Sequence, residues 1–112
     1  MHGDCSVSQA LSDVFVLLGK RWSGLILGAL LESGPAHFAA LRRGIPGISE
    51  RILSTRLTEL AGAGLIVREV EQGPPLGVVY RLTPAGEALR PALTELGRWA
   101  TEHLPAAATS NA

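Results

Sequence analysis

The chain has little net charge, few aromatic residues and a single cysteine. Its 112 residues carry ten basic and ten acidic side chains, so the formal net charge is zero and no overall field draws the chain to polyanions or membranes. Aromatic residues make up only 4% of the sequence, which leaves an aliphatic core. The hydrophobic fraction of 46% excludes a disordered chain. A chain of this length forms one domain with a modest core.

Cysteine and histidine are too sparse for a metal centre. Cys5 stands alone, which excludes an internal disulfide and a cysteine-clustered zinc site, and the three histidines are scattered along the chain. The sequence contains no nucleophile elbow, no glycine-rich phosphate loop and no paired carboxylates. We therefore expect no metal, no cofactor and no enzymatic activity.

No apolar run is long and unbroken. Residues 14–31 approach the length of a membrane span, but Lys20 and Arg21 interrupt them at the centre, where a charge in lipid is costly. The first residues lack the basic segment and apolar run of a signal peptide. We therefore expect a soluble, cytoplasmic protein that does not associate with a membrane.

Apolar periodicity predicts four helices, a β-hairpin and a final helix. The first helices are expected at residues 8–18, 20–32, 38–43 and 49–61, with a Gly- and Pro-rich turn at 44–47. Alternation predicts strands at 65–70 and 78–82. Thr83 and Pro84 open the last helix, which Pro91 should kink or split. This order predicts a mainly α fold with a small β-hairpin, a winged helix-turn-helix over residues 1–104, and a flexible tail over 105–112.

The second predicted helix is apolar all round, which indicates burial on both sides. One stripe is expected to pack on the helix-turn-helix core: Trp22, Leu25, Ile26, Ala29 and Leu30. The opposite side carries Gly24, Leu27, Gly28 and Leu31. The two glycines there would let another backbone approach closely. We expect a twofold dimer in which the terminal helices cover this side, through Leu11, Val14, Phe15 and Leu18 of the first helix and Leu93, Leu96 and Trp99 of the last.

The helix at residues 49–61 is the candidate recognition helix. Its leucines share one face, and the opposite face carries Arg51, Thr55 and Thr58 with Ser54 on the flank. A helix of this length fits the major groove of DNA, where Arg, Ser and Thr can contact base edges or phosphates. Such residues are also ordinary surface residues. The position after a turn and before a hairpin favours the DNA-binding interpretation.

Further arginines lie near this helix, and each has a second interpretation. The complete set of candidate DNA-binding residues is Arg42, Arg43, Ser49, Arg51, Ser54, Thr55, Arg56, Thr58, Arg68 and Arg81. Arg42 and Arg43 could grip phosphates, or simply stabilise a helix C-terminus. Residues 37–81 contain six arginines and four glutamates. This small excess of positive charge does not by itself establish DNA binding. Cys5, just before the first helix, is either a reactive thiol or an inert residue at a mobile end.

The ordered set of these features resembles the HxlR-type winged-helix transcription regulators of bacteria, relatives of the MarR group. The matching pieces are Cys5, Gly19-Lys20-Arg21-Trp22, Phe38 to Arg43, Gly47-Ile48-Ser49, Leu53-Ser54-x-Arg56-Leu57-x-x-Leu60, Gly64-Leu65-Ile66-x-Arg68, Pro74-Pro75, Tyr80-x-Leu82-Thr83-x-x-Gly86 and Trp99. Two positions depart from the family pattern. Gly28 replaces a larger, often basic residue, and Val79 replaces a common acidic residue.

The resemblance implies a homodimer that binds operator DNA, with residues 49–61 as recognition helix and 67–82 as wing. The terminal helices would form the dimer interface, and Cys5 matches a position that some members use to sense oxidants or electrophiles. A small-molecule effector is the other open possibility for the signal. An alternative function is a winged-helix module for protein–protein contact without DNA. The neutral charge and the glutamates at positions 50, 59, 69 and 71 favour that alternative.

Overall fold

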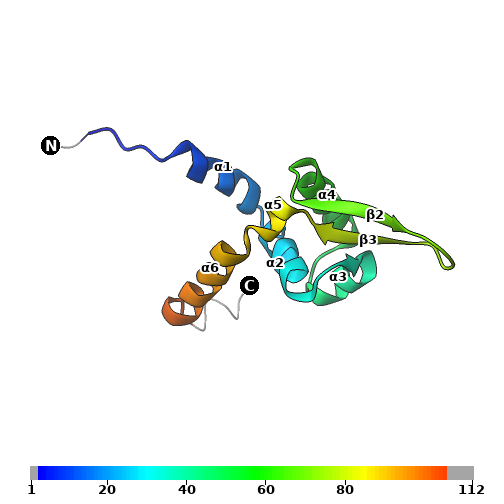
Figure 1. Ribbon diagram of the computed structural model, residues 1–112. Coiled ribbons are helices and arrows are strands. Elements are labelled where there is room, and N and C mark those ends of the chain that lie inside the picture. Colours follow the sequence, from blue (N-terminus) through cyan, green and yellow to red (C-terminus); the bar gives the residue numbers. More distant parts are fainter. Residues whose placement is uncertain (1–2, 106–112) are drawn as a thin grey trace.

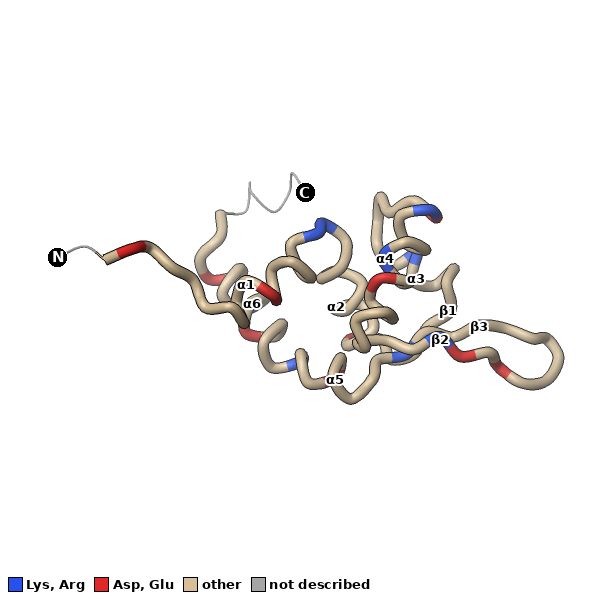
Figure 2. The backbone as a smooth tube through the Cα atoms, turned by 90° about the horizontal axis from the view of Figure 1, so that it is seen from above, with Lys and Arg blue, Asp and Glu red and all other residues tan. Residues whose placement is uncertain are grey.

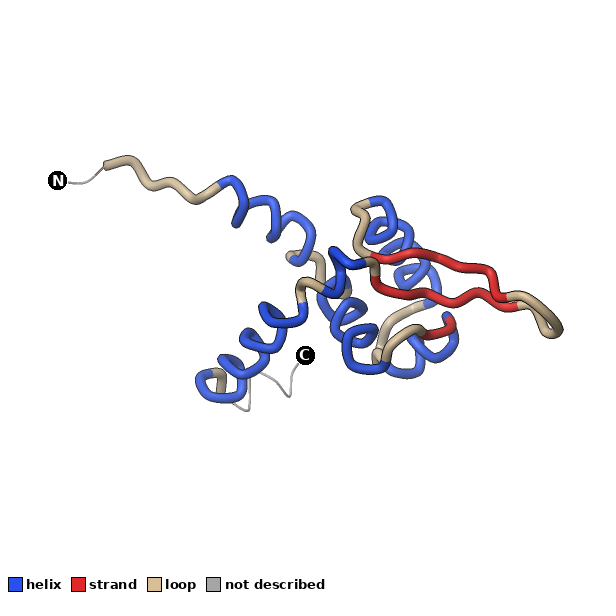
Figure 3. The backbone as a smooth tube through the Cα atoms, viewed as in Figure 1, coloured by secondary structure: helices blue, strands red, loops and turns tan. Residues whose placement is uncertain are grey.

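The computed structural model describes residues 3–105, drawn as a ribbon in Figure 1 and by secondary structure in Figure 3. The helices are α1 (Gln9–Leu18), α2 (Ser23–Ser33), α3 (Phe38–Gly44), α4 (Glu50–Gly62), α5 (Pro84–Glu87) and α6 (Arg90–His103). The strands are β1 (Ala36–His37), β2 (Ile66–Glu71) and β3 (Gly77–Leu82). Apart from Pro105, the tail expected at residues 105–112 lies outside the described residues.

Side-chain caps begin three of the helices where the sequence predicts helix starts. The hydroxyl of Ser8 accepts a hydrogen bond from the Leu11 amide, and that of Ser49 accepts one from the Ile52 amide, both at 3.1 Å. Thr83 caps α5 in the same way. These bonds satisfy backbone donors that lack a partner inside the helix. Ser49 therefore fixes where the candidate recognition helix α4 starts.

The three strands form one antiparallel sheet in the order β1-β3-β2. The hairpin of β2 and β3 confirms the predicted wing, which extends far beyond the helices (Figures 1 and 3). Strand β1 is missing from the sequence prediction, because two residues are too few to show an alternation. Ala36 pairs with Tyr80 and His37 with Val79. Through these pairs β1, which leads directly into α3, holds the middle of the wing strand β3.

Helices α2, α3 and α4 and the start of β2 enclose the hydrophobic core. Ile26, Leu27, Leu53, Leu57 and Leu60 are at most 2% exposed. The predicted core-facing stripe of α2 is wrong: the buried residues lie one position further along the sequence than expected. The buried stripe is Ser23, Ile26, Leu27, Leu30 and Leu31, the i, i+3, i+4, i+7, i+8 pattern of one face. The helix starts at Ser23 rather than near residue 20. The small hydroxyl side chain of Ser23 is itself buried.

The other side of α2 is open. Leu25, expected in the core, is 54% exposed. A Cβ atom added at Gly24 or Gly28 would meet nothing within 4 Å. These glycines border a surface groove together with Leu25 and the turn at residues 44–46. The helix is therefore apolar all round, as predicted, but only one of its sides is covered within the chain.

Helices α1 and α6 project away from the core, on the side opposite the wing (Figure 1). The predicted break of the last helix is confirmed, because α5 ends at Glu87 and α6 begins at Arg90 with Pro91 in its first turn. Neither α1 nor α6 contains a buried residue. No single helix among residues 3–105 is long and apolar enough to cross a membrane. Helices α1 and α2 reach that length and hydropathy only as a pair, bent by 83°.

Candidate nucleic-acid interface

Helix α4 turns a polar face to solvent. Leu53, Leu57 and Leu60 are in the core. Residues three and four positions apart lie on the same face of a helix, so the opposite face of α4 must point outward. The exposed side chains on that face are Arg51, Ser54, Thr55 and Thr58. The Thr58 hydroxyl donates to the Ser54 carbonyl at 3.1 Å. The face expected to meet the major groove is thus free of other parts of the chain.

The wing lies directly beside this face. A shallow groove of about 290 Å³ separates α4 from the hairpin, and its walls carry Ser54, Thr58, Arg68 and Tyr80. Arg68 comes from β2 and pairs across the ladder with Tyr80 of β3. The arginine is exposed. Residues that are distant in sequence therefore form one continuous polar surface on α4 and the wing.

Carboxylates neutralise half of the arginines in this region. Arg42 lies 3.2 Å from Glu50, Arg56 lies 3.1 Å from Glu59 and Arg81 lies 2.7 Å from Glu69. Figure 2 shows the resulting alternation of basic and acidic residues along the helix-turn-helix and the wing. Among residues 3–105, Arg43, Arg51 and Arg68 form no ion pair. The surface is therefore less basic than its arginine content suggests.

Arg56, also a candidate DNA-binding residue, is largely covered by the chain. Only 20% of its side chain is exposed, and its Nε is buried without a hydrogen-bond partner in the described part of the chain. Position 56 lies next to the buried leucine stripe of α4, so its guanidinium bends to the Glu59 carboxylate. In the folded chain Arg56 is thus engaged with Glu59 on the same helix.

A contact across the sheet joins β1 to the end of β2 nearest the loop of the hairpin. Nε2 of His37 lies 2.7 Å from a carboxylate oxygen of Glu71. His37 belongs to β1 and Glu71 to β2, so the contact spans the central strand β3. It passes over Gly77, where a Cβ atom would lie 2.8 Å from the Glu71 carboxylate and 3.6 Å from the His37 ring. The absence of a side chain at Gly77 opens the path for this contact, which no sequence pattern predicts.

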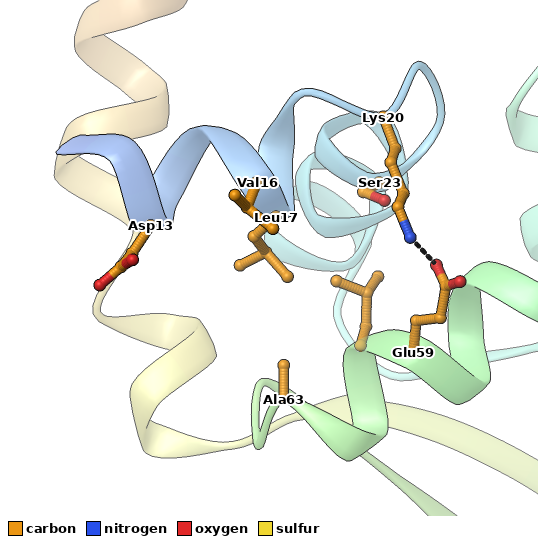
Figure 4. Close-up of a pocket in the computed structure, with 8 residues that line it drawn as sticks. Asp13, Val16, Leu17, Lys20, Ser23, Glu59 and Ala63 are labelled. Carbon is orange, nitrogen blue, oxygen red and sulfur yellow. Dashed lines mark ion pairs between the residues drawn. The ribbon is translucent and has the colours of Figure 1, made fainter. Parts of the chain in front are cut away.

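Another ion pair joins the turn before α2 to the candidate recognition helix α4. Lys20 Nζ lies 3.1 Å from Glu59, at one end of a half-open cavity of about 450 Å³ between α1 and α4 (Figure 4). Val16, Leu17 and Ala63 supply apolar walls, and Asp13 stands at the opposite end. The hydrogen bond from Lys20 lowers the pKa of the Glu59 carboxyl below its usual 4.5, with Arg56 adding to the effect.

This lowered pKa predicts a pH-dependent contribution to stability. The folded chain holds Glu59 ionised more strongly than the unfolded chain, so the pair stabilises the fold above pH 4.5. The contribution disappears as the pH falls through the lower, folded pKa. Urea unfolding of the wild type and Lys20→Met should therefore differ at pH 7 and converge in acid. A difference that persists unchanged at pH 2 would contradict this origin.

The expected dimer residues divide into two groups. Leu11, Phe15, Leu96 and Trp99 are 47–61% exposed and lie on the projecting helices α1 and α6. Leu18 and Leu93 pack partly against the core, and Val14 is half-buried. Val16, absent from the expected set, is the most exposed apolar side chain of α1 at 72%. Cys5 is exposed in the segment before α1.

These features define a winged helix-turn-helix protein of the transcription-regulator class. The chain belongs to the HxlR-like helix-turn-helix family, whose model matches residues 17–108. It is 39% identical over 92 residues to the HTH-type transcriptional regulator YodB of Bacillus subtilis strain 168, covering 82% of this chain and 81% of YodB. Because the similar proteins are named as transcriptional regulators, the family resemblance read from the sequence is confirmed.

Solved structures of similar proteins have the same fold as this chain. The reduced form of YodB from B. subtilis superimposes with a TM-score of 0.78 at 36% identity, covering 88% of this chain and 96% of that one. Diamide-treated YodB gives a TM-score of 0.71 at 36% identity, covering 90% and 99%. The redox regulator HypR in its reduced form gives 0.77 at 29% identity, covering 84% and 92%. The winged-helix fold is therefore confirmed.

Proposed function

We propose that this regulator is a cytoplasmic homodimer that binds operator DNA in a sequence-specific manner, with α4 in the major groove and the wing beside it. The observation that carries the proposal is the solvent-facing row of Arg51, Ser54 and Thr55 on α4. A helix that follows a turn and presents such a row fits the docking of helix-turn-helix proteins, whose second helix reads base edges.

Arg51 is the residue on which the DNA interaction should depend most. It is exposed and forms no ion pair among residues 3–105, so its guanidinium is free to donate two hydrogen bonds to a guanine. Arg51→Ala should weaken operator binding by about 1–3 kcal/mol. The measurement is fluorescence anisotropy with DNA from upstream of the protein's own gene, at several salt concentrations.

A matched control comes from α6. Arg98 is also exposed, with 63% of its side chain accessible, and pairs with Glu95; Arg98→Ala should leave DNA affinity unchanged because α6 projects away from α4. Equal affinity of Arg51→Ala and wild type, with both folded, would reject the role of Arg51. Absence of salt-dependent DNA binding by the wild type would favour the alternative, a protein-interaction module.

A dimer is supported by the apolar side chains that α1 and α6 leave in solvent. Phe15, Val16 and Trp99 are each more than half exposed, and exposed apolar surface on a small protein in water often marks an interaction site. The open glycine side of α2 offers a place where a second backbone can approach. Two copies would place their recognition helices about 34 Å apart, one turn of DNA.

We also propose that Cys5 makes this regulator responsive to thiol oxidants. Its thiol is exposed just before α1, beside the helices proposed for the dimer, and the structurally similar YodB has been solved after diamide treatment. With one cysteine in the chain, the available products are a disulfide to a second copy or to a small thiol.

The test is the variant Cys5→Ser. It should bind operator DNA as the wild type does, because Cys5 lies outside the proposed DNA surface, but its binding should no longer respond to diamide. Gel shifts with and without diamide, followed by dithiothreitol, measure this. The same diamide response in both proteins would leave Cys5 without a sensing role.

A further inference from the structure

A carboxylate stands at the end of the recognition helix that should enter the major groove. Glu50 is the first residue of α4, and 69% of its side chain is exposed. In helix-turn-helix complexes the N-terminal residues of the recognition helix contact base edges. A bare carboxylate at this place would be repelled by the surrounding phosphates. Glu50 therefore needs either a compensating charge or a position away from DNA.

Arg42 supplies the compensating charge. Its Nη1 lies 3.2 Å from Oε1 of Glu50, and the two side chains come from successive helices, α3 and α4. Arg43 follows on α3 and lines the same shallow surface depression as Glu50. A carboxylate accepts up to about four hydrogen bonds, so an ion pair with Arg42 through Oε1 leaves Oε2 able to accept a hydrogen bond from another group. The pair presents acceptor oxygens to the groove with no net charge.

Glu50 also lies close to the exposed polar residues of α4 that are proposed to contact the bases. Glu50 and Ser54 are one turn apart on α4, about 6 Å along the helix axis, and both are exposed. We propose that Glu50 is a specificity-determining residue that accepts a hydrogen bond from the exocyclic N4 amine of a cytosine, while Arg42 shields its charge. Among the bases, cytosine presents a donor rather than an acceptor in the major groove, which matches a carboxylate. This inference rests on the proposed DNA-binding function.

The experiment is selection of binding sites from a randomised DNA library by the full-length wild type, Glu50→Ala and Glu50→Gln. The wild type should prefer cytosine at one position of each half-site, by at least about five-fold. Both variants should lose the preference at that position and keep it elsewhere. Their dependence of affinity on salt should equal that of the wild type, because no phosphate contact changes. Glu87→Gln, which alters an exposed Glu–Arg pair between α5 and α6, is the matched control and should select wild-type sites.

Two results would overturn the inference. If Glu50→Gln binds all sequences more tightly and its salt dependence is steeper by about 0.9 per protomer, then Glu50 competes with a phosphate for Arg42 and reads no base. If the variants select the same sites as the wild type, or lose a preference for adenine instead, the assignment to cytosine fails. A wild type that enriches no sequence at all would overturn the proposed function itself, which is a distinct outcome.

Discussion

Replacing Phe15 with glutamate should convert the proposed dimer into monomers and abolish operator binding. Phe15 is 61% exposed on α1, so the substitution leaves the core of the chain intact. In the proposed dimer the same ring is buried, and large aromatic side chains at the centre of an interface each contribute about 2 kcal/mol or more. The twofold axis repeats the change, so the dimer should weaken by about 4 kcal/mol, about a thousand-fold.

Sedimentation at micromolar concentration measures the mass, and anisotropy measures DNA binding on the same samples. Val70→Glu is the control, because Val70 is equally exposed at 63% but lies on the wing, and its mass should stay that of the wild type. A wild type that sediments as a folded monomer would refute the dimer. A Phe15→Glu protein of unchanged mass would remove α1 from the interface.

The glycine side of α2 gives the dimer a second, independent test. A Cβ atom at position 28 would meet nothing within 4 Å in the free chain, the position borders an open surface groove, and leucine favours the helix more than glycine does. Gly28→Leu should therefore fold as stably as the wild type while weakening dimerisation and DNA binding together. Normal dimerisation of this variant, measured by sedimentation, would show that the second copy does not approach α2 there.

Local patterns predicted most of this fold because local physics determines it. The caps at Ser8, Ser49 and Thr83 depend on a hydroxyl three residues before the amide that it satisfies. The leucine stripe of α4 depends on spacing within one helix. Pro91 breaks the last helix because proline is tolerated only in a first turn. Each of these can be inferred without knowing where the other elements lie.

The failures have a tertiary origin. The buried face of α2 begins with Ser23. Because serine is polar, a hydrophobic pattern does not predict that it is buried. Strand β1 exists because the wing folds back beside it. Arg56, a candidate DNA-binding residue of the same helix as Glu59, is paired with that glutamate in the folded chain, which the list of candidates alone does not indicate. The pairing of Arg42 with Glu50 joins two helices, so the carboxylates that argued against DNA binding gain a role only in the folded chain.

The tightest structural constraint lies at the junction between the wing and the terminal helices. Gly86 is buried in α5, and a Cβ atom there would lie 2.2 Å from the backbone oxygen of Leu65 and 2.9 Å from Leu82. The Leu65 oxygen cannot easily move, because it accepts a hydrogen bond from the Thr83 amide at 3.0 Å. A methyl group at position 86 must therefore displace α5 from the start of β2.

Gly86→Ala should destabilise the fold by roughly 3 kcal/mol, since overpacking against backbone leaves no rotamer to adjust. The melting temperature should fall by about 12–24 °C. Gly97→Ala is the matched control, because a Cβ atom in that part of α6 meets nothing within 4 Å and alanine favours a helix by up to about 1 kcal/mol. Thermal unfolding followed by circular dichroism compares the two variants, at one protein concentration because the proposed dimerisation would make stability depend on concentration. A Gly86→Ala protein as stable as Gly97→Ala would mean that α5 can shift freely, and that the wing and the terminal helices are not rigidly connected.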